Sequence, residues 1–290
     1  MNNFHKPVLL QEVIDGLRIE KNKKYIDATL GGGGHTKKIL ELGGEVLGID
    51  VDRDALEYIG SEIKNQNSKI KNWERLKLAR GNFRDIDKIA RLNSFTKLAG
   101  IIFDLGVSSH QIDTPTRGFS FQNEGPLDMR MDQDLGVRAL DLIKILTKGE
   151  LNEIFNKFGE ESRSWQISDA IVSARSMKEI KTTRDLAEIV FKIAGQSKKV
   201  FQALRIVVND ELNSIMNALP KAMEILETNG RLCVISFHSL EDRIVKRKFI
   251  EFEEKGMGRI ITEKPIVPSS QEIALNKRAR SAKLRIFEKN

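Results

Sequence analysis

The sequence has few of the residues that build disulfide-linked or metal-linked structure. Its 290 residues include one cysteine, Cys233, and four scattered histidines, so neither an internal disulfide nor a zinc site is expected. No apolar run approaches the roughly 18 residues that span a bilayer. The beginning, MNNFHKPVLLQEV, lacks the basic start and long apolar stretch of a secretory signal. We therefore expect a cytoplasmic protein with no metal and no membrane partner.

Charge is plentiful but unevenly distributed. The chain has 48 lysine and arginine residues against 41 aspartate and glutamate residues, which gives a net charge of +7. Residues 243–290 contain 13 basic and 6 acidic side chains and so carry this whole excess. A basic C-terminal region suits a polyanionic partner such as RNA. With 40% apolar and 31% charged residues, the composition is that of a chain that folds.

Strand-like runs alternate with helical patterns in the first third of the chain. Runs rich in β-branched and apolar residues lie at 25–30, 45–50, 76–81 and 100–106, and amphipathic patterns lie between them at 35–42, 54–66 and 83–92. Such alternation predicts successive right-handed βα units and a parallel sheet. The expected fold class is α/β, with a doubly wound, Rossmann-like sheet.

The alternation stops after Asp104. A loop at 107–135 follows, and the next convincing strand-like run comes only at 230–237. Four stretches with apolar residues at helical spacing fill the interval, at 139–146, 150–158, 164–175 and 182–195. The last stretch opens with the cap-like pattern Thr182-x-x-Asp185. We interpret this part of the chain as an insertion.

The expected organisation is therefore one discontinuous core with an inserted domain. We assign 1–109 and 206–290 to the α/β core and 110–205 to an all-helical domain that shapes access to substrate. Three further elements complete the core: a long helix at 200–226, a helix at 240–253 and a last strand near 282–289.

Four consecutive glycines, Gly31–Gly34, follow the first strand-like run at the mouth of a helix. Glycines at this position let a ligand approach the backbone and the N–H groups of the helix start. A P-loop would continue with lysine and serine or threonine, whereas His35 and Thr36 follow here, and Thr36 also breaks a G-x-G-x-x-G fingerprint. The loop indicates a ligand other than a nucleoside triphosphate or dinucleotide, and a plain tight turn is the alternative.

The ends of the next three strand-like runs carry further candidates. Asp50 closes the second run, where a carboxylate binds ribose hydroxyls, and Asp52 competes for that role. Phe83 follows the third run and either packs on a purine or belongs to the core. Asp104 ends the fourth run at the edge where such sheets hold their chemistry, which makes it the candidate catalytic residue. A cofactor with an adenosine half and no pyrophosphate fits this set, namely S-adenosylmethionine.

Candidate RNA contacts lie outside this edge. The loop at 117–121 carries an arginine and two phenylalanines, which either hold a phosphate and stack a base or pack the loop onto the core. A histidine after the fifth strand-like run is either functional or part of a helix start. The basic C-terminus supplies two arginines. The candidates are Arg117, Phe119, Phe121, His238, Arg278 and Arg280.

Taken together, eight motifs resemble those of the RsmH, or MraW, family of small-subunit ribosomal RNA methyltransferases. They are HKPVLLQE, IDATLGGGGHT, DLGVSSHQID, RGFSF, GPLDMRMD, VFQALRIVVNDEL, ISFHSLEDRIVK and RARSAKLR, in this order from residue 5 to 285. The resemblance implies S-adenosylmethionine-dependent methylation of the N4 amine of a cytidine in the decoding region of bacterial 16S ribosomal RNA. It also implies that the cofactor contacts are Gly33, Gly34, His35, Asp50, Phe83, Asp104 and Gln111.

Two departures from the family pattern concern the RNA cleft and not the cofactor contacts. His110 stands where proline is common, and Lys277 replaces a proline before the RARS motif. The resemblance implies 16S ribosomal RNA or the small subunit as partner, and the sequence leaves open whether the chain forms a homodimer. Two rival classes are a nicotinamide-dependent oxidoreductase, which the broken glycine fingerprint disfavours, and a non-catalytic RNA-binding protein.

Overall fold

The computed structural model describes residues 7–65 and 72–290. Within the motifs named above, residues 5 and 6 lie outside this range, as does residue 66 at the end of a predicted helix. The chain forms two compact units, one made of Met1–Gly106 with Leu212–Asn290 and the other of Val107–Glu211. Each unit is described by itself.

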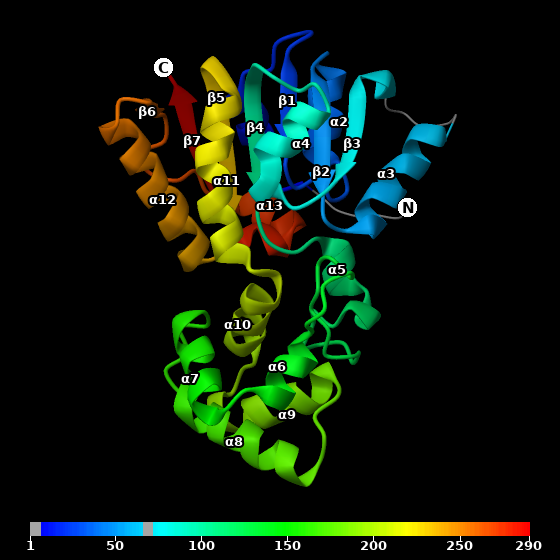
Figure 1. The fold of residues 1–290 in the computed structure, drawn as a ribbon, viewed down its shortest axis with the longest axis vertical. Coiled ribbons are helices and arrows are strands. Elements are labelled where there is room, and N and C mark those ends of the chain that lie inside the picture. Colours follow the sequence, from blue (N-terminus) through cyan, green and yellow to red (C-terminus); the bar gives the residue numbers. More distant parts are fainter. Residues whose placement is uncertain (1–6, 66–71) are drawn as a thin grey trace. The chain divides into compact units, whose positions relative to one another are not determined.

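The first unit contains a seven-stranded sheet with the order β3-β2-β1-β4-β5-β7-β6 (Figure 1). The strands β1 to β5 pair in parallel, and β7 is antiparallel to both of its neighbours. The bounds are β1 Lys24–Asp27, β2 Glu45–Asp50, β3 Leu76–Arg80, β4 Leu98–Asp104, β5 Leu226–Ser236, β6 Gly258–Ile260 and β7 Lys283–Lys289. The predicted α/β fold with a Rossmann-like sheet is confirmed. The short β6 was not predicted, because three residues carry too little periodicity.

Two apolar layers cover the two faces of this sheet. Along each strand alternate side chains enter opposite layers, as Tyr25 and Ile26 do on β1. Helices α4, α11 and α12 pack on one face, and α1 and α2 on the other. The helices of this unit are α1 Leu10–Leu17, α2 Gly34–Glu41, α3 Arg53–Lys64, α4 Ile86–Leu92, α11 Glu211–Ile225, α12 Ser239–Glu254 and α13 Ser270–Leu275. In the described part of the chain, no helix has both the length and the apolar character needed to cross a membrane.

The second unit is helical. Its helices are α5 Ser109–Asp113, α6 Ala139–Ile145, α7 Lys148–Lys157, α8 Ser164–Met177, α9 Thr183–Ala194 and α10 Lys198–Asn209. They enclose a separate apolar core that includes the fully buried Phe155 and Ile167. The predicted cap of α9 is present, because the Thr182 hydroxyl accepts from the Asp185 N–H at 3.1 Å and the Asp185 carboxylate accepts from the Thr182 N–H at 2.9 Å.

The long helix predicted at 200–226 is two helices, and this moves the domain limit. Asp210 takes left-handed dihedrals (φ 50°) between α10 and α11, and the carboxylate of Glu211 pairs with Arg205 at 2.8 Å across the break. The predicted limit at 205/206 is therefore wrong, because it cuts α10, which belongs to the helical unit. The apolar spacing continues across the break and hides it from sequence reasoning.

Candidate active site

The carboxyl ends of β1, β2 and β4 meet at one edge of the sheet. In the parallel register Asp27 of β1 lies opposite Gly48 and Ile102, each two residues before the end of its own strand. Asp50 and Asp104 therefore flank the end of β1. After β1 the chain forms β2 and β3 on one side of β1 and then crosses to form β4 on the other side. The strand ends at β1 and β4 are therefore the switch point, where doubly wound sheets bind ligands.

Gly33 has a backbone conformation that other residues rarely adopt. Its φ is +70°, and a Cβ placed there would lie 2.7 Å from Cδ1 of Ile59. Gly34 begins α2, and a Cβ there would lie 2.8 Å from the Pro7 ring. Gly33 is therefore required by its positive φ and by packing against Ile59, and Gly34 is required by packing against Pro7.

Asp50 is fixed by the glycine loop itself. Its Oδ2 accepts from the Gly31 N–H at 2.8 Å, and its Oδ1 accepts from the Asp52 N–H at 2.9 Å. Burial raises the pKa of Asp50 to about 6, although both backbone hydrogen bonds favour the charged form. The competing Asp52 caps α3, since its side chain accepts from the Asp54 N–H. Of the two, Asp50 is the residue tied to the loop.

Asp104 and His35 face each other at the end of β4. The Asp104 N–H donates to the Thr29 hydroxyl at 2.6 Å, and one carboxylate oxygen lies 3.9 Å from Nδ1 of His35. The His35 ring is buried, and its Nε2 lies 3.1 Å from the Val8 carbonyl, which can only accept. Nε2 therefore carries a proton, and Nδ1 is the nitrogen turned toward Asp104.

Asp27 is a buried member of this edge that the sequence reasoning left out. It is 1% exposed, and its carboxylate accepts from the Thr36 hydroxyl at 2.7 Å and from the Thr29 N–H at 3.3 Å. Burial raises its pKa. The signal was present, because Asp27 ends a strand just as Asp50 and Asp104 do. Through these two hydrogen bonds Asp27 links the end of β1 to the residues on both sides of the four glycines.

Phe83 lies after β3, in a short helical turn at Phe83–Asp85. It is partly buried and meets the buried Phe103 edge to face, with ring centroids 5.6 Å apart. Both alternatives from the sequence therefore apply in part: one side of the ring packs on the core, and the side chain stays partly exposed. A partly exposed aromatic ring beyond the strand ends can pack on a purine.

Two of the predicted RNA contacts have structural roles instead. Arg117 is 3% exposed, and its Nη2 donates to the backbone carbonyls of Arg130 and Met131, so its guanidinium supports the loop and is not available to hold a phosphate. His238 caps α12, with Nε2 3.1 Å from the buried Glu241 carboxylate. The prediction for Arg117 is wrong, because the loop folds back over its guanidinium.

The remaining candidates divide by exposure. Phe119 packs against the core of the helical unit, whereas Phe121 is 40% exposed and touches Phe201 edge to face at 5.7 Å. Arg278 and Arg280 are exposed. Gln111 is buried in the helical unit and forms the cap of α5 with Ser108: its Oε1 accepts from the Ser108 N–H at 3.0 Å.

Comparison with known proteins identifies the family of this chain. A model of the MraW methylase family matches residues 2–290. The chain belongs to the MraW methylase family. The chain is 40% identical to "Ribosomal RNA small subunit methyltransferase H" of Halothermothrix orenii (98% of each chain covered) and 41% identical to the protein of that name from Carboxydothermus hydrogenoformans (100% of this chain, 99% of that one).

Among solved structures, similarity is looser. A Streptococcus mutans protein described as a methyltransferase, solved in complex with SAH, overlays with a TM-score of 0.47 at 16% identity, covering 98% of this chain and 99% of that one. Membership of the MraW methylase family rests on the sequence matches alone. The family is one of methylases, the reaction class that the sequence motifs indicate.

Proposed function

We propose that this methyltransferase transfers a methyl group to the N4 amine of a cytidine in the decoding region of bacterial 16S ribosomal RNA. The observation that carries the proposal is the identity of about 40% over nearly the whole chain with relatives named for small-subunit ribosomal RNA. Such a substrate places the enzyme in the cytoplasm. The exposed basic residues near the C-terminus fit a polyanionic partner.

Each residue of the sheet edge has a role in this proposal. Gly33 leaves room for the methionine part of the cofactor, Asp50 accepts from the ribose hydroxyls, and Phe83 packs on the adenine. We place the Asp104 carboxylate beside the reacting groups and the His35 ring next to that carboxylate. The helical unit, including the exposed Phe121, is assigned to substrate recognition.

S-adenosylmethionine supplies an electrophilic methyl group on a sulfonium. The lone pair of the cytidine amine forms the new C–N bond while the C–S bond breaks, and the surplus amine proton leaves to water. Because that lone pair is delocalised into the ring, an acceptor for an amine N–H localises it and favours attack. The Asp104 carboxylate is the candidate acceptor, and holding the two partners in line supplies much of the rate.

A direct test combines the purified protein, labelled S-adenosylmethionine and small-subunit RNA, both naked and assembled. Mass mapping of the labelled RNA should place a single methyl group on the N4 of one cytidine in the decoding region. Methylation at another base or another position would contradict the proposed substrate. Cofactor binding without single-turnover transfer to either RNA form would instead favour the non-catalytic RNA-binding alternative.

The affinity for S-adenosylmethionine should depend on pH through Asp50. Ribose hydroxyls donate to the ionised carboxylate, so binding favours the charged form, whereas burial holds the pKa of the free protein at about 6. Affinity should therefore rise as pH increases through 6, by up to about tenfold per pH unit below it, and level off above 7. Calorimetry at several pH values measures this. The Asp50→Asn variant removes the titration at this site, and an equally steep slope in it would exclude Asp50.

The exposed arginines near the C-terminus should contribute to salt-dependent RNA binding. Replacing Arg278 and Arg280 with glutamine should weaken RNA affinity and lower the slope of log affinity against log salt by roughly 0.7 for each lost phosphate contact. Lys88→Gln, an exposed charge on α4, is the matched control. If the double variant keeps both affinity and slope, these charges only solvate the surface next to β7.

A further inference from the structure

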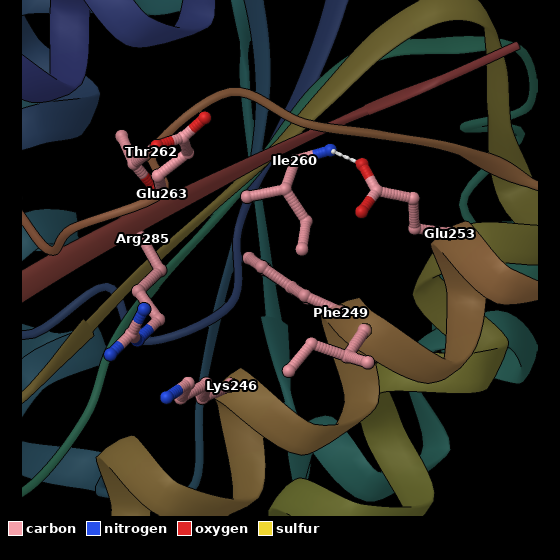
Figure 2. A pocket seen from close by; sticks show the side chains of 8 residues that line it. Lys246, Phe249, Glu253, Ile260, Thr262, Glu263 and Arg285 are labelled. Atoms are coloured by element: carbon pink, nitrogen blue, oxygen red, sulfur yellow. Dashed lines mark hydrogen bonds between the residues drawn. The ribbon is translucent and has the colours of Figure 1, made fainter.

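A second cavity lies away from the cofactor edge, between α12, β6 and β7 (Figure 2). Its volume is about 290 Å³, at the lower end of the range for small-ligand sites. Its apolar wall is formed by Phe249, Ile250 and Ile260. In the sheet, β5 separates β7 from β4, so the residues of this cavity take no part in the site at the ends of β1, β2 and β4.

One side of the cavity carries more positive than negative charge. Arg285 is 7% exposed and donates from Nε to the Asp242 carboxylate at 2.6 Å and from Nη2 at 3.4 Å. Lys283 shares the same carboxylate at 3.1 Å, so one negative charge serves two cations. In the described part of the chain, Nη1 of Arg285 has no hydrogen-bond partner. An anionic group in the cavity can therefore accept from Arg285.

Lys246 adds a second donor on the same side. It follows Asp242 by one helical turn on α12 and lines the cavity next to Arg285, as Figure 2 shows. Among residues 7–65 and 72–290, no carboxylate lies within ion-pair distance of its ammonium. Two nitrogen donors beside an apolar wall suit a phosphate attached to a flat ring.

Acidic acceptors line other parts of the cavity. Glu253 accepts from the Ile260 N–H at 2.7 Å through one oxygen and lies across the cavity from Lys246 in Figure 2. Glu263 and Thr262 follow β6. A matching ligand has a phosphate for the cationic side, a ring for the apolar wall and N–H groups on the ring edge for the acidic acceptors. An unstacked nucleotide has these parts.

We propose that this cavity binds one nucleotide of the substrate RNA outside the target base, with its phosphate on Lys246 and Arg285 and its base against Ile250 and Ile260. The proposal rests on the proposed function, because it assumes an RNA substrate. It places an anchor for the RNA within the region 243–290 that carries the excess positive charge of the sequence. An anchor of this kind adds affinity and sets the position of the RNA strand.

The test uses two variants that change the cavity in different ways. Lys246→Gln removes a donor, and Ile250→Trp fills the cavity without changing charge. The matched controls are Lys255→Gln, directly after the same helix, and Val267→Trp, an exposed apolar residue outside the cavity. We expect both cavity variants to weaken binding of a short single-stranded RNA about tenfold, with S-adenosylmethionine affinity and melting temperature equal to those of the controls.

A second arm uses adenosine monophosphate and identifies the ligand as a nucleotide. In wild-type protein it should shift the amide resonances of α12 and β7, and in the Ile250→Trp variant the shifts should disappear. RNA affinities of both cavity variants equal to those of the controls would overturn the proposal. The proposal would also be overturned if the variants bind naked RNA normally yet lose activity only on assembled subunits, since that result assigns the cavity to a protein partner.

The proposed function is tested separately. Normal methylation by the cavity variants would leave the proposed function intact. A wild-type protein that binds RNA through this cavity and transfers no methyl group would refute the proposed function alone.

Discussion

We expect the Gly33→Val variant to lose S-adenosylmethionine binding, with affinity at least about 100-fold weaker than in the wild type. Gly33 has a φ of +70°, where a β-branched residue is strained by about 1–3 kcal/mol. A Cβ would also lie 2.7 Å from Cδ1 of Ile59, so the loop or the Ile59 side chain has to shift. Any shift of the loop disturbs the bond between the Gly31 N–H and Asp50. Calorimetric titration of the folded variant measures the loss.

A glycine in the helical unit separates strain from the loss of the site. Gly195 has the same conformation, φ +71°, and nothing lies within 4 Å of a Cβ placed there. Gly195→Val should therefore lower the melting temperature by a few degrees, through backbone strain alone, and keep full cofactor affinity. If the valine at 33 lowers the melting temperature in the same way but leaves affinity unchanged, the glycines form only a tight turn.

Strands β1 to β5 and β7 could be predicted from sequence because each of them has a local signature. The runs ending at Asp27, Asp50 and Asp104 are short, apolar and followed by helical patterns, and parallel pairing then places their ends at one edge. The break at Asp210 could not be predicted, since it depends on a single left-handed residue between two helices that have similar apolar spacing. The short β6 exists only through its pairing with β7.

Site residues could be predicted from sequence where they lie at the end of a strand or are glycines. The role of a polar side chain could not be predicted where nearby backbone groups offer it hydrogen bonds. Asp50 and Asp104 lie where the strand pattern predicts. Arg117 carries a charge typical of a phosphate contact, but its guanidinium donates instead to backbone carbonyls of its own loop. Gln111 and His238 both serve as helix caps, a role that depends on where a helix begins.

We expect Asp104→Asn to separate chemistry from cofactor binding. The substitution keeps the shape of the side chain and the bond from its backbone N–H to the Thr29 hydroxyl, which is 2.6 Å long. It removes the negative charge that faces Nδ1 of His35 at 3.9 Å. If the carboxylate accepts the N–H of the cytidine amine, single-turnover methylation at saturating S-adenosylmethionine should slow by roughly 100-fold or more, while cofactor affinity stays within a few-fold of the wild type.

The opposite pattern would assign Asp104 to the cofactor. Affinity and rate at low S-adenosylmethionine would then fall together, and saturating cofactor would restore most of the rate, because only a binding contact is lost. Asp15→Asn, an exposed carboxylate on α1, controls for the loss of one charge and should change neither quantity. Near-normal affinity together with a near-normal single-turnover rate in Asp104→Asn would exclude both roles and leave Asp104 as a strand-end residue held by Thr29. Because the amine proton can leave to water, a loss of rate that is the same at every pH would identify Asp104 as a hydrogen-bond acceptor in the transition state and not as a general base.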